Sequence, residues 1–135
     1  LSGRWEDPAI GAALGLTPDQ VRPDAAVLGY PVVHLAALLE EIGAPEALRL
    51  DRQVRPGHPP VFLWATVRDA TVPVENTLDY ARALRAAEVP FELHLFADGP
   101  HAMGLADRES ARDEDHCNAH AAAWHPLCVD WLKGR

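Results

Sequence analysis

Asp69 and His101 are the two residues of this sequence whose types and positions best suit catalysis. Each follows a short apolar run, Val61–Thr66 in one case and Phe91–Phe96 in the other. If both runs are parallel strands, their carboxyl ends meet at one edge of the sheet, where sites are built in open α/β sheets. A carboxylate that fixes the tautomer of an imidazole makes it an effective general base near neutral pH. Alone, the first residue suits a strand-end turn and the second a solvated loop, but together they predict an acid–base pair.

A strand–helix–strand unit is needed to bring this pair together. Residues 74–87 have apolar positions at helical spacing, after Pro73 and beside Glu75, which suit a helix start. Residues 25–30 form a further apolar run ended by Pro31, which is typical of a buried parallel strand. We therefore predict an α/β fold with a parallel sheet of about three strands and flanking helices. The apolar face of the central helix comprises Val74, Leu78, Ala81 and Leu84.

The other segments predict elements that surround this unit. Residues 34–50 show helical spacing of leucines, and residues 17–20 suit a short helical turn. Residues 123–132 predict a docking helix with Pro126 in its first turn, and its predicted face comprises Trp124, Leu127, Cys128, Trp131 and Leu132. We expect residues 1–16 to be the tail of a helix and a loop, and the acidic segment 102–119 to be a surface loop.

Composition narrows the class of protein. The 135 residues, 14.7 kDa in mass, suit a single domain that spans residues 1–135, and 48% hydrophobic residues suit a folded soluble chain. The net charge of −8 argues against a nucleic-acid partner. No run approaches the roughly 20 apolar residues of a membrane span, so we expect no membrane partner. Two cysteines, Cys117 and Cys128, are too few for a disulfide framework and leave the compartment open.

Several segments together resemble one family of enzymes. They are PPVFLW at 59–64, VPVEN at 72–76, FADGPHAMGL at 96–105, and a final helix with Trp124 and Trp131. In order and spacing they are similar to the C-terminal half of α/β-hydrolase esterases, of the acetylesterase and acetylxylan-esterase-like group related to dienelactone hydrolases. The resemblance runs from about Trp5 to the end of the chain. It implies a serine ester hydrolase, or carboxylesterase, that acts on small acyl esters and needs no cofactor.

The resemblance also implies a Ser-Asp-His triad, in the chain order nucleophile, acid, base. Asp69 matches the acid and His101 the base. The nucleophile of such a triad lies on a G-x-S-x-G elbow upstream of both, and this sequence contains no such motif. The two serines, Ser2 and Ser110, lie outside any such frame. We therefore expect the nucleophile-bearing half to be absent from this chain and the isolated chain to be inactive.

Three alternatives stay open at this point. The chain could be a non-catalytic remnant or binding module that self-associates along the edge strand Ala25 to Tyr30. A metal-binding protein is a weaker alternative, because the acidic segment near the end contains histidines and a cysteine, although their spacing matches no closed zinc pattern. Cys117 as a substitute nucleophile is weaker still, since nothing places it on a strand-to-helix turn. The possible metal ligands are Asp113, Asp115, His116, Cys117, His120 and His125.

Overall fold

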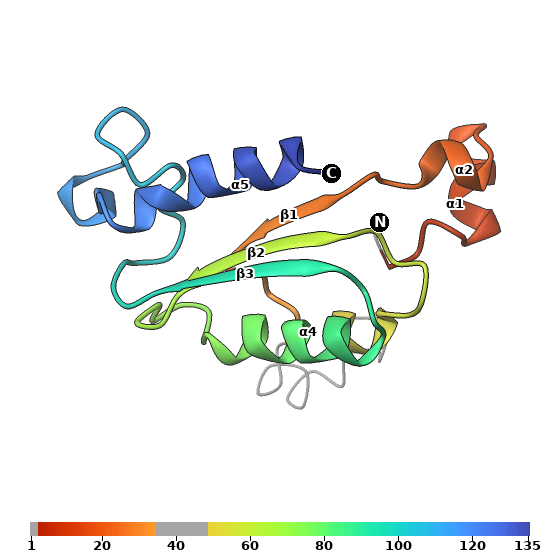
Figure 1. Cartoon of the computed structure of the whole chain (residues 1–135), viewed down its shortest axis with the longest axis horizontal. Coiled ribbons are helices and arrows are strands. Elements are labelled where there is room, and N and C mark those ends of the chain that lie inside the picture. The colour runs from red at the N-terminus through yellow and green to blue at the C-terminus, as the bar shows by residue number, and fades with distance from the viewer. Residues whose placement is uncertain (1–2, 35–48) are drawn as a thin grey trace.

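Three parallel strands form the centre of the protein, in the order β1-β2-β3. They are β1 (Ala26–Gly29), β2 (Val61–Thr66) and β3 (Phe91–Phe96). The computed structural model describes residues 3–34 and 49–135. Helices cover both faces of this sheet, with α5 on one side and α4 on the other (Figure 1). The predicted α/β fold class, with a parallel sheet of three strands and flanking helices, is confirmed.

β2 is central because its residues are apolar on both faces. All six are buried, and they alternate between two cores. Val61 and Leu63 pack on the side of α4, whereas Phe62 and Trp64 pack on the side of α5. Neither of the outer edges of β1 and β3 pairs with another strand within the described ranges.

α4 (Glu75–Ala86) is the helix predicted between the last two strands, but its buried face differs from the predicted one. Ala81 and Leu84 are buried as expected, whereas Val74 and Leu78 are only half-buried. Asn76, Thr77 and Tyr80 are buried in their place. The prediction was wrong because polar side chains can be buried when their hydrogen bonds are satisfied. The tyrosine hydroxyl lies 3.1 Å from a ring nitrogen of His58, which is itself buried.

α5 (Trp124–Lys133) follows a short 3₁₀ turn, η4 (Ala121–Ala123), and packs against the opposite face of the sheet. Pro126 lies in its first turn, as predicted. The indole of Trp124 stacks on that of Trp64, with ring centroids 4.8 Å apart and planes 9° apart. The predicted apolar face was too wide, because Leu127 and Leu132 are exposed.

The N-terminal part contains two short helices. The expected helix tail and loop at residues 1–16 proved to include a capped helix, α1 (Pro8–Leu14). Its N-cap, Asp7, accepts a hydrogen bond from the backbone N–H of Ala9 at 3.0 Å. The predicted turn after residue 17 is α2 (Pro18–Val21), and a 3₁₀ helix, η2 (Leu50–Gln53), precedes β2. Most of the helix predicted over residues 34–50 lies outside the described residues.

The segment 102–119 is more than the surface loop that we expected. Met103, Ala106 and His116 are buried, and a 3₁₀ helix, η3 (Glu114–His116), lies within it. Met103 and Ala106 pack in the core beneath α5, so they anchor this otherwise polar segment to the rest of the protein. Within the described ranges, no helix has the length and apolar character needed to cross a membrane.

Candidate active site

Asp69 lies in the turn after β2, and its carboxylate is fully enclosed, with a side-chain exposure of 0%. One carboxylate oxygen accepts hydrogen bonds from the backbone N–H groups of Thr71 and Val72, at 2.8 and 2.9 Å. The other oxygen lies 2.7 Å from Nδ1 of His101. The residue thus forms a strand-end turn and contacts the histidine at the same time, so the two interpretations of Asp69 do not exclude each other.

The contact determines which ring nitrogen of His101 carries the proton. An ionised carboxylate can only accept hydrogen bonds, so Nδ1 donates to Asp69. In the neutral imidazole this leaves Nε2 with its lone pair, and within the described ranges no hydrogen bond occupies that nitrogen. The side chain is 28% exposed, so the ring is held on one side and open on the other. This is the arrangement that general-base catalysis requires.

Tyr30 is a third residue at this site, which the sequence did not indicate. It directly follows β1, and its ring centroid lies 4.7 Å from that of His101. Its hydroxyl oxygen accepts a hydrogen bond from the N–H of Gly104 at 3.2 Å. Its φ of 38° lies in the left-handed region, which is rare for a bulky residue and often marks a functional site. All three strands therefore place a side chain at the same edge of the sheet.

The loop that carries His101 is held at several points. The hydroxyl of Thr66, the last residue of β2, donates to the carbonyl of Gly99 at 2.7 Å. The indole N–H of Trp124 donates to the carbonyl of Gly104 at 3.0 Å. The side-chain amide of Asn118 donates to the carbonyl of Asp98 at 2.8 Å. These bonds come from a strand, a helix and a loop, so they fix the imidazole relative to the whole sheet.

An open hollow of about 510 Å³ adjoins the imidazole. Its wall includes Arg68, Thr71, His101, Cys117 and Asn118. The thiol of Cys117 is free and exposed, but within the described ranges no hydrogen bond joins it to the imidazole. The structure therefore gives Cys117 no activating base, and it does not support this residue as a substitute nucleophile.

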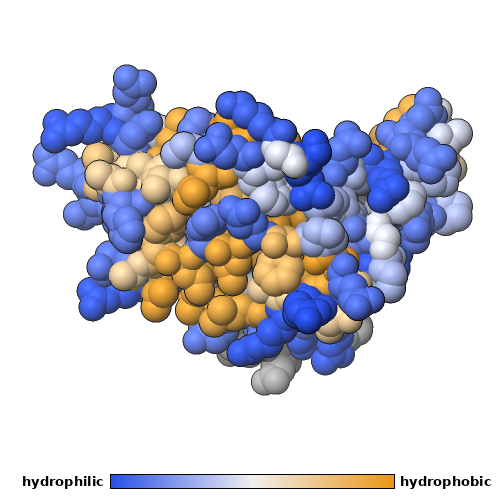
Figure 2. Space-filling view, viewed as in Figure 1, coloured by the Kyte–Doolittle hydropathy of each residue, from blue (hydrophilic) through white to orange (hydrophobic). Residues whose placement is uncertain are grey.

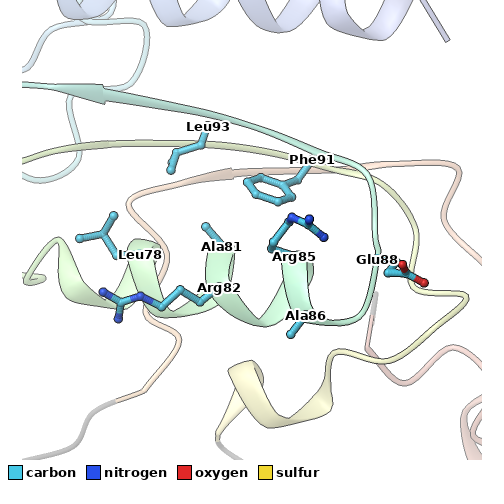
Figure 3. Close-up of a pocket in the computed structure, with 8 residues that line it drawn as sticks. All are labelled: Leu78, Ala81, Arg82, Arg85, Ala86, Glu88, Phe91 and Leu93. Atoms are coloured by element: carbon cyan, nitrogen blue, oxygen red, sulfur yellow. The ribbon is translucent and has the colours of Figure 1, made fainter.

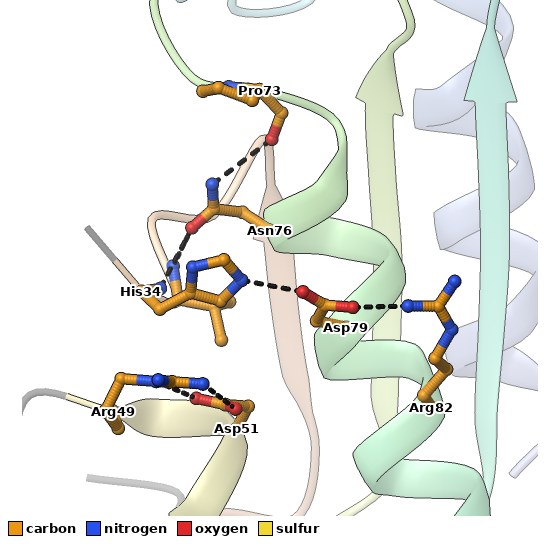
Figure 4. Close-up of polar contacts among 8 residues, drawn as sticks. His34, Arg49, Asp51, Pro73, Asn76, Asp79 and Arg82 are labelled. Carbon is orange, nitrogen blue, oxygen red and sulfur yellow. Dashed lines mark hydrogen bonds and ion pairs between the residues drawn. The ribbon is translucent and has the colours of Figure 1, made fainter. Parts of the chain in front are cut away.

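A second histidine–carboxylate pair, His34 and Asp79, is structural (Figure 4). Nε2 of His34 lies 2.8 Å from Asp79, whose other oxygen binds Arg82. The side-chain oxygen of Asn76 accepts from the backbone N–H groups of Val33 and His34, at 3.0 and 2.9 Å. These contacts tie the chain after β1 to α4.

The candidate metal ligands near the end of the chain do not converge. Both ring nitrogens of His116 are engaged, one by Asp113 and the other by Arg112. The ring of His120 lies edge-on to Phe96, and that of His125 lies against Trp124. No group of three or more metal-binding side chains is found in the part of the chain that the structure describes. The metal-binding alternative therefore has no structural support.

His94, in β3, contacts an aromatic ring and a carboxylate rather than the candidate site. Its ring lies 5.2 Å from that of Phe62, and its Nε2 lies 2.7 Å from Glu92.

The fold defines the class of protein: the chain has an α/β-hydrolase fold, and the solved structures similar to it include carboxylesterases. No protein-family model matches it. It superposes on a carboxylesterase from Lactobacillus plantarum with a TM-score of 0.81 and 29% identity, over 98% of this chain and 52% of the other. It superposes on an acetyl ester-xyloside bifunctional hydrolase from Caldicellulosiruptor lactoaceticus with a TM-score of 0.70 and 36% identity, over 84% and 43%.

A further relative, found by sequence, is matched over a shorter stretch. Endo-1,4-beta-xylanase B from Butyrivibrio fibrisolvens is 35% identical over 100 residues, which are 65% of this chain and 16% of the relative. The chain thus spans about half the length of the first solved structure and a smaller part of the curated relative.

Proposed function

We propose that this chain is the C-terminal half of a serine ester hydrolase that acts, in its complete form, on acetyl or other short acyl esters. The observation that carries the proposal is the 2.7 Å contact between His101 and the enclosed carboxylate of Asp69. Two further findings support it: the solved relatives include a carboxylesterase, and the chain spans about half of that structure.

The proposed roles follow from the geometry of the pair. A serine supplied by the other half attacks the acyl carbon, and Nε2 of His101 takes its proton. The same nitrogen then protonates the leaving alcohol, while Asp69 holds the ring and stabilises the imidazolium. The serine and the oxyanion donors come from the missing half, because no G-x-S-x-G motif is present in these 135 residues.

The missing half has a natural place along β1. The outer edge of this strand has no strand partner within the described ranges, and Val27 is 42% exposed. A further parallel strand there would satisfy the free backbone groups and cover the apolar side chains. This occupant replaces the self-association along residues 25–30 that the sequence left open.

Two measurements test the proposal. First, the coding sequence upstream of Leu1 should contain a G-x-S-x-G elbow, and its absence would favour a non-catalytic remnant. Second, the 135-residue chain should hydrolyse p-nitrophenyl acetate no faster than its own His101→Ala variant, because it lacks the nucleophile. The longer polypeptide should be active and lose about 10⁴-fold in kcat on Asp69→Asn, the loss seen for the equivalent change in a serine protease. His94→Ala is the matched control and should keep its activity.

A further inference from the structure

The ring of Tyr30 contacts both the imidazole of His101 and the aromatic core beneath α5. Its centroid lies 4.7 Å from that of Trp64, edge to face at 68°, and 4.7 Å from that of His101, tilted by 57°. These are the offset geometries that aromatic pairs prefer. The indole of Trp64 is buried and stacks in turn on Trp124 of α5. A continuous series of ring contacts therefore joins the imidazole to the core.

The backbone of Tyr30 is held in a conformation that does not suit its size. Its N–H donates to the carbonyl of Trp64, in the strand beside it, at 2.7 Å. Its φ of 38° is rare for a bulky residue and persists only where the surrounding contacts impose it. Glycine or asparagine adopts such a φ at lower cost. We infer that the large ring is present at this position for its contacts rather than for the turn.

The hydroxyl of Tyr30 holds the loop that carries His101. Its oxygen accepts the N–H of Gly104, three residues after the histidine, at 3.2 Å. The carbonyl of the same glycine accepts the indole N–H of Trp124 at 3.0 Å. Aromatic side chains from β1 and α5 thus bind both backbone groups of Gly104. One tyrosine therefore supports the imidazole with its ring and the following loop with its hydroxyl.

We propose that Tyr30 is a positioning residue: its ring fixes the orientation of the His101 imidazole, and its hydroxyl fixes the loop that carries it. The χ2 torsion of a histidine is soft, so the single hydrogen bond from Nδ1 to Asp69 leaves the imidazole some freedom to turn. Contact with a second ring removes this freedom, so Nε2 keeps one direction. The consequence for catalysis rests on the proposed function, whereas the contact itself does not.

A matched control lies on the opposite face of the sheet. Phe91, at the start of β3, is also a half-buried aromatic ring, and it packs with the core on the side of α4. Together with Leu93 it lines a groove of about 600 Å³ between β3 and α4 (Figure 3). Figure 2 shows the apolar surface around this groove. No residue of the candidate site lines it, so Phe91→Leu removes a ring without touching His101.

Two variants of the full 135-residue chain separate the ring from the hydroxyl. Tyr30→Phe keeps the ring and removes the acceptor for Gly104, whereas Tyr30→Leu removes both. Exchange of the Gly104 amide with water should become about fivefold faster in both variants, because each loses that hydrogen bond. Exchange of the Nδ1 proton of His101 should become about fivefold to tenfold faster in Tyr30→Leu only, as expected for the loss of an aromatic pair. In Tyr30→Phe and Phe91→Leu it should stay within about twofold of the original chain.

¹⁵N-edited NMR follows both protons, and His101→Ala assigns the imidazole signal. In the original chain, nuclear Overhauser contacts should join the ring protons of Tyr30 to those of His101, a measurement that needs no variant. The proposal would be overturned if these contacts were absent, or if the Nδ1 proton exchanged no faster in Tyr30→Leu. Equal acceleration of that proton in Tyr30→Phe and Tyr30→Leu would also contradict it, because the ring would then have no role of its own.

The longer polypeptide reports the consequence for catalysis. A displacement of about 1 Å in a catalytic group can cost about 100-fold in rate, so Tyr30→Leu should lower kcat for p-nitrophenyl acetate about 10- to 100-fold. KM should stay within about twofold, and Tyr30→Phe should keep kcat within about threefold. A higher KM at unchanged kcat would mean that Tyr30 binds substrate instead, and it would refute the positioning role. A longer polypeptide without any activity would count against the proposed esterase function, and the NMR results would still decide whether Tyr30 positions the imidazole.

Discussion

Replacing Asp69 should destabilise the protein more than replacing His101, although the two side chains contact each other. The carboxylate of Asp69 accepts three hydrogen bonds: from Thr71 at 2.8 Å, from Val72 at 2.9 Å and from His101 at 2.7 Å. Asp69→Ala removes the acceptor of all three. His101→Ala removes only one of them and leaves the turn after β2 intact.

The magnitudes follow from this difference in the number of bonds. A hydrogen bond to a charged group contributes about 1.5–3 kcal/mol, and a buried donor left without a partner costs about 1–3 kcal/mol. Val72 is buried, so its N–H group cannot turn to water instead. We expect His101→Ala to lower the free energy of unfolding by about 1–2 kcal/mol and Asp69→Ala to lower it by about 3–5 kcal/mol. Urea unfolding followed by tryptophan fluorescence measures both values.

Asp69→Asn separates the turn from the histidine and serves if the alanine variant does not fold. The amide oxygen can still accept from Thr71 and Val72, so the turn should survive at a cost of about 1 kcal/mol. The amide then presents its NH₂ group to Nδ1 of His101, which must become an acceptor. The ring proton should therefore move to Nε2, and ¹⁵N NMR of the imidazole reports the change. Equal losses in the two alanine variants, or an unchanged tautomer in Asp69→Asn, would refute the reasoning.

Two other residues give independent predictions. Burial lowers the pKa of His58, so the unfolded chain binds a proton more readily than the folded chain as the pH falls below the ordinary value of 6.5. The contribution of His58 to the free energy of unfolding should be fully present above that pH and should decrease below it. Urea unfolding at several pH values should show a smaller decrease for His58→Gln than for the original chain. Gly99→Ala should lower the free energy of unfolding by about 2–4 kcal/mol in the same assay. Its φ is 143°, and a Cβ there would lie 2.6 Å from buried Met103, so a loss below about 0.5 kcal/mol would show that the loop adapts.

The elements that the sequence predicted well are those whose signals are local. β2 and β3 are apolar runs that begin after prolines, and the structure begins and ends them at the expected residues. Their parallel arrangement follows from the helix between them. The proximity of Asp69 and His101 could therefore be predicted from the sequence, because the two residues follow the ends of neighbouring strands.

The features that the sequence did not predict depend on partners far along the chain. Asn76 is buried because it binds the backbone of Val33, 43 residues away, and Tyr80 is buried beside His58, 22 residues away. Tyr30 binds Gly104 across 74 residues. No pattern within a single segment indicates such contacts. The local feature that could have indicated Tyr30 is its position directly after a strand. Such a position indicates a site residue more strongly when the neighbouring strands also end beside candidate site residues.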